Sequence, residues 1–334
     1  MAHDLDMSNG RANVMVVGEP AWHRLGTVLD DAPTSEAAMR FAGLDWRVEQ
    51  WPLMAASPDD SCEAQNVEGM KALVRTDTRR VLGVHGESYR PLQNRDAFSF
   101  MDSLVEDGQV RYESAGSLKG GRVVWMLARI PTQIRVGSDD VTNPYVLLSN
   151  SHDGTQAIRV YPTAVRVVCN NTLTWAHASN RHELGIRIMH VGDIHRKVAE
   201  ARNALGLVVN HFERYAEQAN TLAERELEPH EAFDYLRATF PMPDEPSKRT
   251  ENSIEQKWDR LNRLYVDHPT NNIPGIARTA WSAFNTVTHY VDHEMRARGE
   301  GDRAVENRLR SSWFGQGARI KAAAFDRALE LCNN

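Results

Sequence analysis

The feature that most constrains the fold is a block of alternating residues between Arg111 and Leu173. Arginines in this block are interleaved with apolar and β-branched residues, and tight-turn signals separate the runs. A two-residue period is typical of strands, and Asp153-Gly154 lies between two such runs, where both residues tolerate the positive φ of a hairpin turn. The block therefore predicts a twisted antiparallel sheet with hairpins that carries positive charge.

Helical periodicity lies on both sides of this block. Thr34 or Ser35 can cap a short helix, and Asn94 can cap a second helix whose apolar residues recur at helical spacing. Further helical patterns cover residues 173–178, 193–226, 253–266, 275–297 and 302–332. The chain is therefore predicted to be an α+β protein, with helices packed on the sheet and a helical part after it.

These patterns suggest an order of domains along the chain. Residues 1–20 are expected to form a flexible arm and residues 21–226 an α+β core domain. Residues 227–334 are expected to form a helical C-terminal region, in which residues 241–253 are a Pro-rich, charged loop.

Composition limits the class of protein. The 334 residues include 39 Lys and Arg and 45 Asp and Glu, for a formal net charge of −6 at pH 7. This excludes a globally basic nucleic-acid coat but not a local basic groove. Three cysteines without a CxxC pair argue against a disulfide framework. No signal-peptide pattern is evident, and no apolar run reaches the roughly 18 residues of a membrane helix, so we expect a cytoplasmic protein without a membrane segment.

Positive charge concentrates inside the β-block, where six basic residues and three acidic ones lie between Ser117 and Cys169. Basic side chains bind phosphates and aromatic rings stack on bases, so this mixture is typical of a sequence-tolerant single-strand binder. The alternative is a solvated sheet face with its aromatic residues in the core. The candidate nucleic-acid-binding residues are Lys119, Arg122, Arg129, Arg159, Arg166, Tyr89, Arg90 and Tyr161. Alternation places Arg122 and Arg129 on opposite faces of an ideal strand, which predicts two patches rather than one groove.

Cys169, His152 and Asp153 form a candidate catalytic set. If the predicted hairpin folds back toward residue 169, the imidazole of His152 could activate the Cys169 thiol in a hydrolase or transferase. A cysteine directly after a valine run is, however, more often a buried small hydrophobe. The residues after it, Asn170 to Thr172, are predicted to form a turn that leads into a helix.

Two other motifs are interpreted as structural. The segment Gly116 to Val123 resembles a phosphate-binding loop, but it has Arg122 where that loop has lysine, and a strand follows it. We therefore interpret it as a glycine-rich hairpin. His289 and His293 have the spacing of two metal ligands on a helix, but no third ligand is evident. We expect no cofactor and no metal.

Several short segments along the chain are shared with a known family. They are Trp22–Gly26, Ala42–Trp46, Tyr89–Asn94, Ser114–Trp125, Asn150–Gly154, Arg166–Leu173, Thr279–Trp281 and Phe314–Lys321. In these segments the chain resembles the phage/plasmid-like proteins of unknown function, which are carried on phages, plasmids and laterally transferred islands. The resemblance implies a mobile-element origin and brings no established activity. In architecture alone, the chain is also similar to the phage single-strand annealing proteins of the RecT/Redβ type, which form rings or filaments and work without ATP.

The leading hypothesis is a binding protein rather than an enzyme. We expect it to bind single-stranded DNA, to anneal strands without ATP in recombination, and to assemble as a homo-oligomer in a ring or filament. One alternative is the hydrolase or transferase built on Cys169. Another is an interaction module that binds a host protein through the acidic segment Glu213–Glu231.

Overall fold

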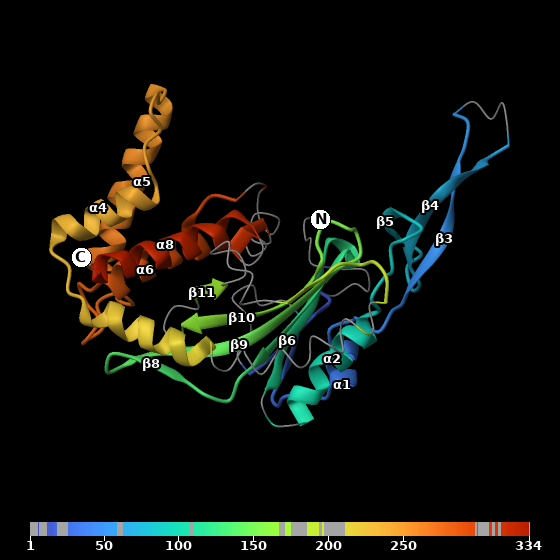
Figure 1. Ribbon diagram of the computed structural model, residues 1–334, viewed down its shortest axis with the longest axis horizontal. Coiled ribbons are helices and arrows are strands. Elements are labelled where there is room, and N and C mark those ends of the chain that lie inside the picture. Colours follow the sequence, from blue (N-terminus) through green and yellow to red (C-terminus); the bar gives the residue numbers. More distant parts are fainter. Residues whose placement is uncertain are drawn as a thin grey trace. The chain divides into compact units, whose positions relative to one another are not determined.

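Figure 1 shows the computed structural model of the chain, which has an α+β fold as the sequence predicts. The structure describes residues 6, 12–18, 26–58, 63–106, 108, 110–166, 171–174, 186–193, 196, 211–297, 299, 307–308, 311–312 and 315–333. Two compact units interleave along the chain. Unit 1 comprises Met1–Pro131, Val146–Val160 and Ile186–Gly206, and unit 2 comprises Thr132–Tyr145, Tyr161–Gly185 and Leu207–Asn334. The sequence pattern placed one boundary near residue 226 instead.

The larger sheet has the strand order β11-β10-β9-β7-β6-β1-β2, with β12 beside β10 and β8 beside β9. Its strands are β1 (Val14–Val17), β2 (Thr27–Leu29), β6 (Arg111–Leu118), β7 (Val123–Arg129), β8 (Ile134–Val136), β9 (Asp140–Ser151), β10 (Ile158–Arg166), β11 (Asn171–Thr174) and β12 (Ile186–Ile188). β9 and β10 contribute residues to both units. Most of the described strand pairs are antiparallel, as predicted, but β1 and β2 are parallel, so the sheet is mixed.

Two predicted turns lie in unit 1. β6 and β7 form the expected glycine-rich hairpin, which closes through the 3-10 turn η1 (Lys119–Gly121). Asp153-Gly154 lies in the turn between β9 and β10, and Gly154 adopts a φ of +69°. The positive φ that the sequence required at this turn is therefore present.

Two helices of unit 1 cover the β1–β6 part of the larger sheet (Figure 1). They are α1 (Ser35–Phe41) and α2 (Asn94–Glu106). Thr34 caps α1, because its side chain accepts a hydrogen bond from the backbone N–H of Ala37 at 3.3 Å. Phe98 and Met101 of α2 are fully buried, which confirms the predicted apolar face of this helix.

A second, smaller antiparallel sheet in unit 1 consists of β3 (Val48–Ala55), β4 (Gln65–Arg75) and β5 (Val81–Gly86). In Figure 1, β3 and β4 extend as a long hairpin away from α1 and α2. Burial falls along β4 from its C-terminal end toward its start, because Leu73, Val74 and Arg75 are buried while Gln65 and Asn66 are exposed. The base of this small sheet is therefore anchored in the core of unit 1.

Unit 2 combines the outer strand β11 with a set of helices. Residues 211–224 are helical, and α4 (Pro229–Thr239), α5 (Lys248–Asp267), α6 (Ala280–His289), the π-helical turn η3 (Tyr290–Glu294) and α8 (Gln316–Cys332) follow. Trp281 lies in the core of this unit, where its indole Nε1 donates to the buried carboxylate of Asp140 at 2.6 Å. The predicted helix at residues 173–178 is wrong at its start, because Leu173 and Thr174 pair with β10 as part of β11. None of the described helices is long and apolar enough to span a bilayer.

Candidate nucleic-acid interface

Arg75, the last residue of β4, is the buried centre of the candidate site. Its side chain is 0% exposed, and its guanidinium lies over the ring of Trp46, 4.5 Å from the centroid. The Nε and Nη2 atoms donate to the carboxylate of Asp77 at 2.6 and 2.8 Å, and Nη1 donates to Asp6. Burial opposes ionisation of Arg75, but the hydrogen bonds to Asp77 and Asp6 raise its pKa overall. The guanidinium is therefore charged and fixed in place.

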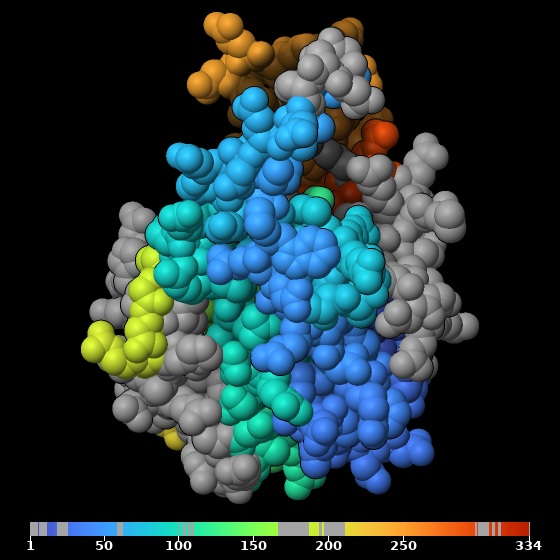
Figure 2. Space-filling model, turned by 90° about the vertical axis from the view of Figure 1, so that its right-hand side faces the viewer, coloured from blue at the N-terminus to red at the C-terminus, as the bar shows by residue number. Residues whose placement is uncertain are grey.

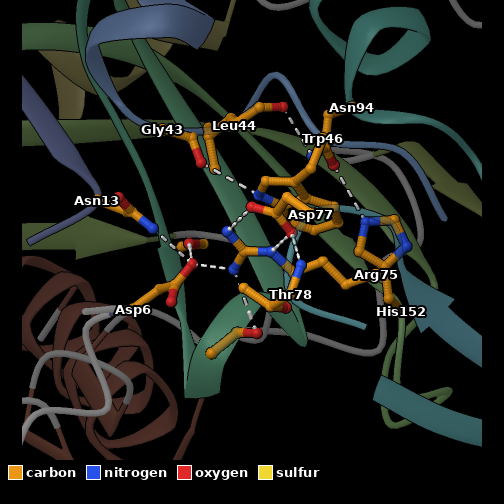
Figure 3. A network of polar contacts seen from close by, with 12 residues as sticks. Asp6, Asn13, Gly43, Leu44, Trp46, Arg75, Asp77, Thr78, Asn94 and His152 are labelled. Carbon is orange, nitrogen blue, oxygen red and sulfur yellow. Dashed lines mark hydrogen bonds and ion pairs between the residues drawn. The ribbon is translucent and has the colours of Figure 1, made fainter. Parts of the chain in front are cut away.

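The same guanidinium holds two connections of unit 1 in position (Figure 3). Asp77 belongs to the turn between β4 and β5, and its Oδ1 also accepts from the backbone N–H of Thr78 at 2.8 Å. Nη1 of Arg75 lies 3.4 Å from the carbonyl oxygen of Gly120 in η1. The conformations of the turn and of η1 therefore depend on one buried side chain.

Basic residues lie in this turn, in η1 or beside them, and we call them the cationic cluster: Arg47, Arg79, Arg80, Lys119 and Arg122. The guanidinium of Arg80 packs on Gly120, because a Cβ added at Gly120 would lie 2.0 Å from its Nη1. The backbone N–H of Arg47 donates to Thr76 at the start of the turn, at 3.0 Å. Three segments that are distant in sequence thus bring positive charge to one place.

The members of the cationic cluster differ from the paired cations elsewhere in the chain. The four arginines are exposed, and within the part of the chain that the structure describes none of them lies at ion-pair distance from a carboxylate. Arg79 and Lys119 adopt φ values of 55° and 53°. Such φ values are unfavourable for residues with a Cβ, and they concentrate at ligand-binding sites.

Two of the carboxylates near the cationic cluster, those of Asp77 and Asp153, already have partners. Asp77 is bound to Arg75. Asp153 accepts hydrogen bonds from the hydroxyls of Ser151 and Thr155 at 2.6 and 2.5 Å. Burial acts to raise the pKa of Asp153, but these hydrogen bonds and the charge of Lys119 lower it overall. Because neither carboxylate neutralises an arginine of the cluster, a local excess of positive charge remains.

His152 supports the site from within the core. Its Nε2 lies 3.1 Å from Oδ1 of Asn94, and its ring meets the Trp46 ring edge-on at 5.5 Å between centroids. Its backbone N–H donates to the carbonyl of Arg122 at 2.7 Å, which ties the β9–β10 turn to the cationic cluster. Complete burial lowers the pKa of His152 to about 3, so the imidazole is neutral at physiological pH.

Tyr89 has a structural position instead of the predicted base-stacking one. Its ring is stacked between His85 and His190, with centroid distances of 4.2 and 4.7 Å, and its hydroxyl donates to the carbonyl of Ser151 at 2.8 Å. Tyr89 is 8% exposed and Tyr161 is 1% exposed. Because neither ring offers an open face, we correct the prediction that either residue stacks on bases in this conformation.

The other predicted phosphate contacts do not join one groove. Arg129 lies seven residues after Arg122, at the far end of β7, and pairs with Glu113 at 3.9 Å. A strand rises roughly 3.3 Å per residue, so about 23 Å separates these two arginines. Arg159 on β10 is half-buried, and Arg90 is exposed and donates to the carbonyl of Glu87. The side chain of Arg166 lies outside the described residues. Lys119 and Arg122 are thus the predicted residues that belong to the cationic cluster.

The catalytic alternative gains no support from its described members. Cys169 lies outside the described residues, so the predicted thiol–imidazole pair has no geometry here. A general base is most effective with a pKa near the working pH, whereas the pKa of the buried His152 is about 3. His152 and Asp153 are accounted for by their structural contacts.

The remaining candidates lie in unit 2. The rings of His289 and His293 are 4.8 Å apart, but no group of three potential ligands that could hold a metal occurs among the residues that the structure describes. Glu213, Glu217 and Glu224 are exposed on the helical residues 211–224, as an acidic interaction surface would require. That surface has no further feature that indicates a partner.

Three members of the cationic cluster, Arg47, Arg79 and Arg80, were not predicted from the sequence. Arg79 and Arg80 directly precede β5, and Arg47 directly precedes β3. Their signal in the sequence was a pair of adjacent arginines, Arg79 and Arg80. The sequence did not show that the turn between β4 and β5 packs on η1, because that contact is made in the tertiary structure.

Comparison with known proteins gives a family without an assigned activity. A family model described as "Domain of unknown function (DUF932)" matches residues 81–313. Two curated proteins of Escherichia coli (strain K12) are similar over 131 residues: UPF0380 protein YfjQ, with 29% identity, and UPF0380 protein YafZ, with 28% identity. Each match covers 37% of this chain and 45% of the relative, so the chain spans less than half of these relatives' length. No solved structure matches the chain.

Proposed function

The chain belongs to the DUF932 family of unknown function, and on that premise we propose, from its own cationic cluster, that it binds single-stranded DNA. The observation that carries the proposal is that four exposed arginines, none at ion-pair distance from a carboxylate among the residues that the structure describes, lie in or beside two turns with Lys119 in an otherwise acidic chain. Guanidinium groups bind phosphate oxygens through two parallel hydrogen bonds. A string of phosphates is therefore the ligand that suits this cluster best.

The buried network supports the proposal because it fixes the cluster before a ligand arrives. Arg75 connects the turn that carries Arg79 and Arg80 to the η1 carbonyl beside Lys119. His152 adds a backbone hydrogen bond to Arg122. Binding then loses less conformational freedom than it would with mobile arginines, which favours affinity.

Strand annealing and assembly into a ring or filament extend this proposal. Annealing without ATP requires that two strands be held close together, and several copies of a cationic surface can do this in an oligomer. The expectation rests on the architecture predicted from the sequence and on the absence of a nucleotide-binding motif in it. The DNA-binding step has to be shown first.

Fluorescence anisotropy of a labelled oligonucleotide tests the proposal. We expect binding at about 50 mM salt that weakens steeply by about 200 mM, because bound phosphates release counterions as basic residues replace them. The slope of log K against log salt should be roughly −0.7 for each phosphate neutralised on a single strand. No detectable binding at low salt would refute the proposal.

A further inference from the structure

Trp51 on β3 presents an aromatic ring at the surface of the small sheet. The residue is 40% exposed, in contrast to the buried Trp46, Trp125 and Trp281. Its indole Nε1 donates to the carboxylate of Glu49 at 2.9 Å. This hydrogen bond restrains the orientation of the partly exposed indole ring.

Trp51 lies at the edge of an apolar row that crosses the sheet. In the strand registers, Trp51 is opposite Ala72 and Ala72 is opposite Val84, so the three side chains share one face of the sheet. We call this surface the Trp51 face. Val84 is 41% exposed, and Val81 at the start of the same strand is 48% exposed. Figure 2 shows the side chains of β3 and β4, in lighter blue, as part of the surface of the molecule.

This apolar row continues the cationic cluster. Arg47 directly precedes β3 and lies four residues before Trp51, which corresponds to about 13 Å at the rise of a strand, and the carboxylate of Glu49 that accepts from the indole lies between them in sequence. Stacked nucleotides are spaced by about 3.4 Å per strand, so the distance spans about four nucleotides. Phosphates bound by the arginines would therefore bring the next bases of the same strand to the indole.

We propose that the Trp51 face stacks unpaired bases of a nucleic-acid strand whose phosphates contact the cationic cluster. This inference rests on the proposed function and specifies how the protein would recognise a single strand. The occupant is a single strand because a base inside a duplex has both faces covered by its neighbours. Base–aromatic stacking is indifferent to sequence, since every base has a π-face. The Trp51 face thus provides a preference for single strands without a preference for sequence.

The test compares two labelled oligonucleotides of equal length: an oligothymidine, and an abasic strand that keeps every phosphate but has no bases. For the native chain, we expect the oligothymidine to bind about tenfold more tightly at low salt, as the loss of one stacked base predicts. Trp51→Ala should lower affinity for the oligothymidine by about tenfold and leave the abasic strand unaffected. Trp51→Phe, which keeps an aromatic ring, should retain most of the affinity difference between the two oligonucleotides.

The controls separate this inference from the function on which it rests. Val266→Ala removes an exposed apolar side chain of unit 2 and should change neither affinity. If both oligonucleotides bind equally well and Trp51→Ala changes nothing, the cluster binds phosphates and the stacking role is overturned. If Trp51→Ala alters only the oligomeric state, the face contacts a second copy and the inference is likewise overturned. If neither oligonucleotide binds, the proposed function fails, and the inference fails with it.

Discussion

The guanidinium carbon of Arg75 lies 4.5 Å above the ring of Trp46, and both side chains are buried in the core of unit 1. A cation facing an aromatic ring gains more when the pair is shielded from water. Here the charge is also neutralised by Asp6 and Asp77. This one arrangement positions the exposed arginines, so stability and ligand binding in unit 1 are physically connected.

Replacing Arg75 should lower the unfolding free energy of unit 1 more than a substitution on the surface of that unit does. Arg75→Met removes the cation that binds the buried Asp6 carboxylate, and removal of one member of a buried ion pair typically costs about 3–5 kcal/mol of unfolding free energy. Urea denaturation measures the loss. The double variant Asp6→Asn with Arg75→Met should recover part of it, because the fully buried Asp6 charge is then removed together with its cation. An equal loss in the single and double variants would contradict this account.

The exposed arginines should matter for DNA and not for stability. Arg79→Gln combined with Arg80→Gln should weaken DNA binding and reduce the salt slope by up to roughly 1.4, which is two phosphate contacts on a single strand. Melting temperature should barely change, because exposed substitutions usually alter stability by less than about 0.5 kcal/mol. Lys248→Gln with Arg249→Gln on α5 removes the same charge from unit 2 and should leave the slope intact. If both double variants reduce the salt slope equally, the effect depends on the overall charge of the chain and not on the cationic cluster.

Gly154 should tolerate alanine worse than another glycine of similar backbone conformation. A Cβ at Gly154 would lie 2.2 Å from Cε1 of His85, whereas at Gly69, where φ is +73°, a Cβ meets nothing within 4 Å. Both substitutions incur the strain of a positive φ, roughly 1 kcal/mol. Gly154→Ala should therefore lose clearly more unfolding free energy than Gly69→Ala in parallel denaturation curves. Similar losses would show that His85 moves aside without cost.

Acid should destabilise the chain through His152. Burial lowers its folded-state pKa to about 3, below the value near 6.5 of an unfolded histidine. The unfolded chain therefore takes up the proton first, and stability that is complete above about pH 6.5 is lost as the pH falls toward 3. Between pH 7 and pH 5 this one group accounts for about 2 kcal/mol. His211 and His289, whose pKa values burial lowers to about 4, act in the same range.

The variant His152→Gln isolates this contribution. It should be less stable than the native chain at pH 7, because Trp46 and Asn94 lose a packed partner, but it should lose less stability between pH 7 and pH 5. His230→Gln, at an exposed position, should keep the native pH dependence. Unfolding free energies at the two pH values provide the measurement. An unchanged pH dependence in His152→Gln would show that His152 is not buried as a neutral group.

Local patterns predicted the elements of this fold better than their ends. Alternation with a glycine-rich segment identified the β6–β7 hairpin, and the Asp153-Gly154 turn signal identified the β9–β10 hairpin. Thr34 caps α1 as its position suggested. Leu173 and Thr174 were expected in a helix but form a strand, because pairing with β10 satisfies their backbone groups. A local pattern cannot show that a neighbouring strand has a free edge.

The candidate site, like the fold, could be predicted only in part from the sequence. The sequence by itself determined the α+β class, the hairpins and a local excess of positive charge that includes Lys119 and Arg122. Only the tertiary structure decided which basic residues lie together, since Arg80 packs on Gly120 of η1 and the backbone N–H of Arg47 donates to Thr76 at the start of the same turn. It also buried Tyr89 and Tyr161 and left Trp51 exposed. The physical reason is that periodicity depends on neighbours along the chain, whereas burial and the meeting of charges depend on contacts between segments far apart in sequence.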